Sequence, residues 1–231
     1  MGKPTSGGAG GSGGRGRAVA PAPPDRNITI TEDGDFKELQ TFLGRNISAN
    51  EIGDMIGAPD GAIISIDAWV ATAYFEVSHP NVENMKQQLL REDGKLVLYN
   101  DFIMINKDAP KGMGTQIITR QVEAARKLGI SSIDLEAGGS PSSRNIMNGY
   151  STWPRLGFDA EIPTGTISRI PSEIKGTMRD NTMLELYRTQ AGRDWWRENG
   201  RGLDMKFDTD PNSKSSQALA AYNEERRKRS G

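Results

Sequence analysis

The chain has no cysteine and a single histidine, His79, in 231 residues. The lack of cysteine excludes disulfides, thiolate metal sites and cysteine nucleophiles, and one histidine cannot form a histidine-based metal cluster, so we expect no metal site. A formal net charge of −1 disfavours nucleic acid as a partner. No apolar run approaches the ~20 residues of a membrane helix, and no signal-peptide core is present. These absences predict a cytoplasmic protein with neither a nucleic-acid nor a membrane partner.

Three regions follow from the composition. Residues 1–26 are rich in glycine, serine, alanine and proline, with too little apolar surface to offset the entropy of ordering them, which predicts a disordered arm. Residues 27–167 have the pattern of one globular domain, and residues 168–231 predict an extension packed on it, helical with one strand, LDMKF. Trp195 and Trp196 are expected to pin this extension to the core, with an aromatic acceptor pocket as the alternative.

Local signals predict the elements before residue 95. Ser48 and Glu51 form a capping-box pair ahead of a short helix that Gly57 should end. Asp93-Gly94 is a strong hairpin signal, so residues 85–92 are interpreted as a strand rather than a helix. The remaining expectations are a strand at 27–31, a helix at 35–43, and strands at 62–69 and 71–78.

The most informative stretch runs from residue 95 to residue 158. It predicts a buried strand (KLVLYNDFIMI), a glycine loop (APKGMGT), an amphipathic helix (QIITRQVEAARKLGI) and a second strand (SIDLEAG), followed by NGYSTWPRLGF. Glycines between a strand and a helix can present several backbone N–H groups to one anion. The loop lacks the P-loop spacing, and Ile117 stands where a dinucleotide fingerprint needs its third glycine. We therefore predict a phosphate cradle, with an ordinary glycine turn as the alternative.

The strand before this loop is apolar on both faces except for Asn100 and Asp101. A buried polar pair without partners would cost about 1–3 kcal/mol. A β-bulge or a polar cleft at this point is therefore the preferred interpretation, and a hydrated edge position is the alternative.

Two motifs together, Ala109-Pro110-Lys111-Gly112-Met113-Gly114 and Trp153-Pro154-Arg155-Leu156-Gly157-Phe158, resemble those of the Gcn5-related N-acetyltransferases. The resemblance covers residues 95–158. It implies a mixed, mostly antiparallel α/β sheet flanked by helices, acetyl-CoA as acyl donor, and a small-molecule or protein amine as acceptor, with a homodimer left open. The cofactor residues that it implies are Met104, Ile105, Lys111, Gly112, Met113, Gly114, Thr115 and Asn145.

The chain departs from this family in both motifs. Ala109 replaces a Gln or Arg, a mild change because backbone amides supply most contacts to the anion. Trp153 replaces the tyrosine that in many members protonates the CoA thiolate, and an indole N–H cannot act as an acid. Tyr150 is the substitute candidate, although it is equally interpreted as a packing residue.

The general base is left open by the sequence. Asp101 and Glu136, with Glu76 as a further choice, are carboxylates on predicted strands near the expected cleft. Each is also compatible with a solvated surface position. The alternative to an acetyltransferase is a catalytically silent module of the same fold that acts as a structural or interaction domain.

Overall fold

The computed structural model describes residues 26–31 and 33–230. The arm expected at the N-terminus lies outside the described residues, apart from Arg26. In the described part of the chain, no helix is both long and apolar enough to cross a membrane.

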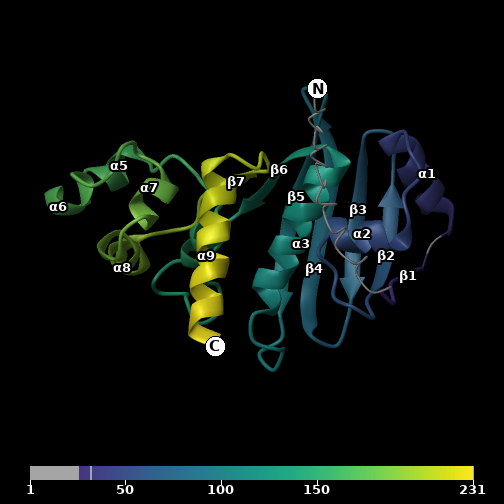
Figure 1. The fold of residues 1–231 in the computed structure, drawn as a ribbon, viewed down its shortest axis with the longest axis horizontal. Helices are drawn as coiled ribbons and strands as arrows, with labels where there is room; N and C mark the ends of the chain where they lie inside the picture. The colour runs from purple at the N-terminus through teal and green to yellow at the C-terminus, as the bar shows by residue number, and fades with distance from the viewer. Residues whose placement is uncertain (1–25, 32, 231) are drawn as a thin grey trace, which may run out of the picture.

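The described strands form one seven-stranded mixed sheet in the order β1-β2-β3-β4-β5-β6-β7 (Figure 1). Their bounds are β1 Thr29–Ile30, β2 Ile63–Ala68, β3 Thr72–Ser78, β4 Val82–Glu92, β5 Lys95–Ile105, β6 Ile130–Glu136 and β7 Asp204–Asp208. The β1/β2 and β5/β6 pairs are parallel, and the other four are antiparallel. The expected mixed, mostly antiparallel sheet flanked by helices is therefore confirmed.

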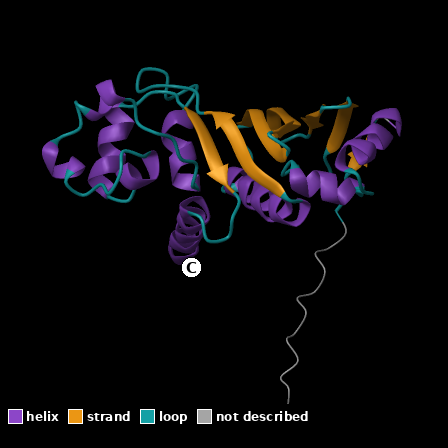
Figure 2. Ribbon diagram, turned by 90° about the horizontal axis from the view of Figure 1, so that it is seen from above, coloured by secondary structure: helices purple, strands orange, loops and turns teal. Residues whose placement is uncertain are grey.

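The helices lie mainly on one face and at one end of this sheet. Their bounds are α1 Asp33–Leu43, α2 Ala49–Met55, α3 Met113–Leu128, α4 Gly149–Thr152, the 3-10 helix η1 Trp153–Leu156, α5 Thr164–Ile167, α6 Ser172–Lys175, α7 Met183–Tyr187, α8 Gln190–Asn199 and α9 Lys214–Ser230. Helices α3 and α9 lie beneath the sheet in Figure 2, whereas α5 to α8 gather beyond its β7 end. The opposite face of the sheet is therefore left without a helical layer in the described residues.

Two local structures predicted from the sequence, the helix cap at Ser48 and the hairpin turn at Asp93-Gly94, are present in the fold. The Ser48 hydroxyl accepts from the Glu51 amide at 3.2 Å while the Glu51 carboxylate accepts from the Ser48 amide at 2.9 Å, so the capping box at the start of α2 is confirmed. Asp93 and Gly94 both have positive φ, 48° and 77°. That geometry matches the right-handed twist of β4 and β5, and the predicted hairpin is confirmed.

The interruption in β5 is a bulge. The β4–β5 register slips between Lys86 and Gln87, so that Asp101 is an extra residue in β5. The Asn100 side chain is 3% exposed, and its amide exchanges two hydrogen bonds of 3.1 and 3.0 Å with Gln121 of α3. The predicted bulge is confirmed, and α3 supplies the partner that keeps the buried amide satisfied.

The C-terminal region joins the core through one strand and two aromatic side chains. Strand β7 extends the sheet by pairing with β6. Trp196 of α8 is fully buried, and its indole Nε1 donates to the Tyr150 carbonyl at 3.0 Å. The Trp195 ring lies beside it, with centroids 6.4 Å apart. Trp196 therefore pins the extension, as expected, and its complete burial speaks against the aromatic acceptor pocket.

Candidate functional site

The pairing of β5 with β6 ends at the bulge, one residue before β6 itself ends. Their parallel ladder runs from the Leu96–Ile130 pair to the Asn100–Leu135 pair and ends there. From residue 102 to residue 105, β5 pairs only with β4 among the described strands. Met104 and Ile105 lie in this stretch. Because the Asn106 amide donates to the Asn81 carbonyl on the β4 side and strand residues alternate, Ile105 presents its backbone N–H and C=O to the β6 side, whereas Met104 faces β4.

The glycine loop follows directly and starts α3. Gly112 has a φ of 90°, a left-handed conformation that favours glycine. The first backbone bond of the α3 ladder runs from the Gln116 amide to the Gly112 carbonyl at 3.0 Å. The amides of Gly114 and Thr115 therefore belong to the first turn, where no intrahelical acceptor exists. The amide of Met113 donates to the Pro110 carbonyl at 3.1 Å, so this predicted donor is already engaged.

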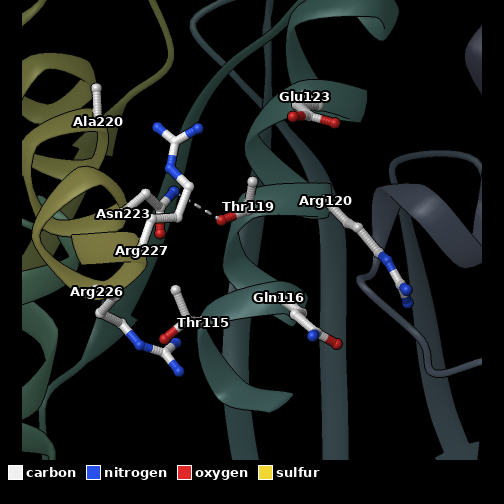
Figure 3. Close-up of a pocket in the computed structure, with 9 residues that line it drawn as sticks. All are labelled: Thr115, Gln116, Thr119, Arg120, Glu123, Ala220, Asn223, Arg226 and Arg227. Atoms are coloured by element: carbon white, nitrogen blue, oxygen red, sulfur yellow. Dashed lines mark hydrogen bonds between the residues drawn. The ribbon is translucent and has the colours of Figure 1, made fainter. Parts of the chain in front are cut away.

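A guanidinium from the C-terminal helix covers the loop. A Cβ at position 112 would lie 2.9 Å from Nη1 and 3.0 Å from Cζ of Arg226. Figure 3 shows Arg226 reaching from α9 toward Thr115, at the N-terminal end of α3. Glycine at 112 is therefore favoured by its φ, and a larger residue there would displace the Arg226 guanidinium.

A groove of about 680 Å³ separates α3 from α9 above this point (Figure 3). Its lining residues are polar or charged except for Ala220, although much of its surface comes from their aliphatic carbons. Arg226 and Arg227 are its cations, and Glu123 is the only carboxylate among the lining residues. The Arg120 guanidinium points away from α9 and donates to the Ala58 carbonyl at 3.3 Å (Figure 3). Burial and, secondarily, Arg26 lower the pKa of Arg120 from its ordinary value, but an arginine remains charged at neutral pH. The groove therefore presents an excess of positive charge.

Arg226 and Arg227 were not among the residues that the sequence singled out. One local signal was available. Lys228 and Arg229 each have a glutamate four residues earlier, and both pairs form in the structure at 2.7 and 2.5 Å. Arg226 and Arg227 have Tyr222 and Asn223 at that spacing. Lys228 and Arg229 are thus paired within α9, whereas Arg226 and Arg227 line the groove.

A smaller hollow of about 210 Å³ lies on the other side of the start of α3. Pro110, Arg120 and His79 are among its lining residues. His79 lies in the turn between β3 and β4, and its Nε2 atom is 3.1 Å from the Asp60 carbonyl oxygen. Within the described residues, no group of three or more histidine, aspartate or glutamate side chains is arranged to hold a metal ion.

Tyr150 and Trp153 are both engaged in packing. Tyr150 is fully buried, and its hydroxyl donates to the Arg197 carbonyl at 2.7 Å. The Trp153 ring meets Phe158 edge-on, with centroids 5.3 Å apart. This geometry favours the packing interpretation of Tyr150 over the general acid.

The candidate bases lie on the sheet face opposite α3. Asp101 accepts from the Gln88 side chain at 2.8 and 3.0 Å. Burial and the nearby carboxylates of Asp204, Asp101, Glu136 and Asp134 raise the pKa of Tyr99. Asp101 and Glu136 therefore share one acidic region around Tyr99.

The third candidate base, Glu76, and the candidate cofactor residue Asn145 lie away from both the acidic region and the groove. Glu76 is exposed on β3 and pairs with Lys86 at 3.3 Å. Asn145 is exposed in the turn at 141–146, and no residue of that turn lines the groove between α3 and α9. Neither side chain is brought to the sites described above.

Comparison of the sequence with protein-family models finds no match, and comparison with curated proteins finds none either. A function for the chain is therefore argued from its own residues. The relevant geometry is a strand that leaves its parallel neighbour, a left-handed glycine at the start of a helix, and a cationic groove beside that helix.

Proposed function

We propose that this protein is an acetyl-CoA-dependent N-acetyltransferase with a Gcn5-related fold. One observation carries the proposal: the open part of β5 leads directly into the glycine loop. A cofactor with an extended, amide-bearing arm and a pyrophosphate needs an open strand edge for the arm, followed directly by an anion-binding loop for the pyrophosphate. The arm takes the place of the missing strand partner, and the pyrophosphate meets the helix N-terminus.

Each end of the cofactor has a matching surface. The backbone of Ile105, next to Met104, would hydrogen-bond a pantetheine amide, as a strand partner would. The amides of Gly112, Gly114 and Thr115, with the Lys111 side chain, would hold the pyrophosphate. Because most of these contacts come from the backbone, Ala109 in the loop motif does not weaken the assignment.

The acidic region around Tyr99 supports an amine acceptor. A primary amine is a cation at neutral pH and is attracted to Asp101 and Glu136. The ammonium must lose one proton before attack and a second as the amide forms, and one of these carboxylates, directly or through a water molecule, passes both protons to solvent. The amine nitrogen then attacks the thioester carbonyl, the new C–N bond forms, and the C–S bond breaks. A thiol with a pKa of ~8.5 can leave as the thiolate and take its proton from water, so no tyrosine acid is required.

The test is a titration with acetyl-CoA followed by an assay for free thiol against mixed amines. At one hundred times its dissociation constant, a ligand raises the free energy of unfolding by about 2.7 kcal/mol, which a thermal scan detects. An unchanged melting temperature at millimolar CoA contradicts the cofactor assignment.

The packed positions of Tyr150 and Trp153 favour a second candidate, a CoA-binding module without catalysis. This candidate predicts the same rise in melting temperature, because the cofactor surfaces are unchanged. It also predicts that no amine releases thiol above background. The thiol assay therefore separates the two functions.

A further inference from the structure

Helix α9 is tied to α3 at two points, one near its start and one near its middle. The Arg126 side chain donates from Nε to the Thr209 carbonyl at 2.9 Å and from Nη2 to the Ser216 hydroxyl at 2.7 Å. Near the other end of the interface, Asn223 Nδ2 donates to Thr119 Oγ1 at 3.2 Å (Figure 3). These contacts place the middle of α9 beside α3, one turn before Arg226 and Arg227.

The turn after η1 makes this close approach possible. Gly157 has a φ of 95° and ends η1. A Cβ at this position would lie 2.8 Å from the Phe207 ring and would collide with the Ser215 carbonyl at the start of α9. Gly157 thus allows α9 to start close to η1. From that start, the last turns of α9 bring Arg226 to Gly112.

We infer that α9 completes the phosphate site, so that the C-terminal extension is part of the cofactor-binding machinery. Arg226 contacts the pyrophosphate held at Gly112, and Arg227 contacts the 3′-phosphate of the CoA nucleotide in the groove between α3 and α9. This inference rests on the proposed function for the identity of the ligand. It also makes a claim of its own, that the site takes a nucleotide carrying two separated phosphate groups.

Three observations carry the inference. The Arg226 guanidinium lies over Gly112, where a phosphate bound to the first turn of α3 would meet it. Arg227 points into the groove between the two helices (Figure 3), and it forms no ion pair within the part of the chain that the structure describes. The volume of about 680 Å³ is within the ~300–1,000 Å³ of small-molecule sites, and its two arginines from α9 suit a phosphorylated ligand.

The experiment measures the affinity of the full chain for CoA, dephospho-CoA and adenosine 3′,5′-bisphosphate by calorimetry. Arg226→Ala should weaken CoA and dephospho-CoA by roughly 10- to 100-fold each, because a charge-assisted hydrogen bond is lost. Arg227→Ala should weaken CoA and adenosine 3′,5′-bisphosphate and leave dephospho-CoA unchanged. Arg229→Ala is the matched control on the same helix, since its partner is Glu225, and it should alter none of the affinities.

Folding is checked by the melting temperature of each variant without ligand, and Arg226→Lys keeps the charge if Arg226→Ala does not fold. If Arg226→Ala and Arg229→Ala both bind CoA as strongly as the wild type does, the inference is overturned and the proposed function stands. Arginine-dependent binding of adenosine 3′,5′-bisphosphate without binding of CoA supports the phosphate site and overturns the acetyltransferase. Absence of binding to all three compounds overturns both.

Discussion

Substitutions at Gly112 and Gly129, which flank helix α3, can distinguish the effect of backbone strain from an effect on ligand binding. Both have positive φ, 90° and 73°, but only Gly112 has a side chain above it. Alanine in a left-handed conformation costs roughly 1–2 kcal/mol. We expect Gly112→Ala and Gly129→Ala to lower the free energy of unfolding by about this amount in urea titrations. Only Gly112→Ala should also reduce the thermal shift produced by CoA, because its methyl group displaces Arg226. A similar loss of CoA binding in Gly129→Ala would show that the loop responds to α3 stability alone.

Tyr150 provides the next test at this scale. Its buried hydroxyl donates to the Arg197 carbonyl, so Tyr150→Phe should lower the free energy of unfolding by about 1 kcal/mol. Because we assign it no acid role, the turnover number with acetyl-CoA should stay within twofold of the wild type, a margin far smaller than the ~10²-fold loss of a general acid. Steady-state thiol release and urea unfolding measure the two effects. A fall in turnover of ~10²-fold or more would restore the tyrosine as the acid.

At the scale of single elements, the capping box of α2 has a pH signature. The hydrogen bond from the Ser48 amide is the main cause that lowers the pKa of Glu51 from the ordinary 4.5. A lowered folded pKa means that the stabilisation is fully present above about pH 4.5 and is lost as the pH falls through the folded pKa. Glu51→Gln should therefore destabilise the protein by ~0.3–1 kcal/mol at pH 7, with the difference vanishing in acid.

Ser48→Ala is the non-titrating control for that measurement. It removes the hydroxyl that accepts from the Glu51 amide and should cost about 1 kcal/mol. Since a serine hydroxyl does not ionise in this range, most of its loss should persist in acid. Urea unfolding at pH 7 and near pH 3 compares the two variants. A Glu51→Gln effect that is equal at both pH values would show that the carboxylate charge plays no part.

The elements that sequence predicts are those with local causes. The α2 cap and the Asp93-Gly94 hairpin depend on residues within a few positions of one another, and both formed as expected. The bulge at Asp101 was also predictable, because polar residues interrupt an apolar strand. Gln121, the hydrogen-bond partner of Asn100, was not predictable, since nothing in the sequence spacing links α3 to residue 100. The short helices α5 and α6 lack a periodic apolar face and were not anticipated.

The candidate site was only half predictable for the same reason. The loop that begins α3 is a local motif, and the sequence located it. The approach of Arg226 depends on the turn at Gly157 and on contacts between Arg126 and Ser216, which join segments far apart in the chain. Tyr150 was a candidate acid from its position relative to Trp153, but the carbonyl that engages its hydroxyl belongs to α8. Tertiary contacts of this kind leave no periodic pattern in the sequence.

At the scale of the whole molecule, the two faces of the sheet carry opposite charge near the divergence of β5 and β6. The arginines of the α3–α9 groove lie on the helical face. Asp101 lies on the other face, beside Gln88 and Tyr99. An anionic cofactor and a cationic acceptor would thus approach from opposite sides and meet at the gap between the strands. If the proposed function holds, such separation would keep each substrate out of the site that suits the other.

This arrangement predicts which carboxylate matters for transfer. Asp101→Asn removes the base nearest the bulge, so kcat/KM for a primary amine should fall by about 10²-fold. The thermal shift produced by CoA should not change, because the cofactor surfaces are untouched. Glu76→Gln is the control, since Glu76 is on β3 and is paired with Lys86, and its rate should stay near that of the wild type. An equal loss in both variants would mean that the acidic face acts only through its total charge. No loss in Asp101→Asn would assign the proton to Glu136 or to water, because these are the acceptors that remain at the gap.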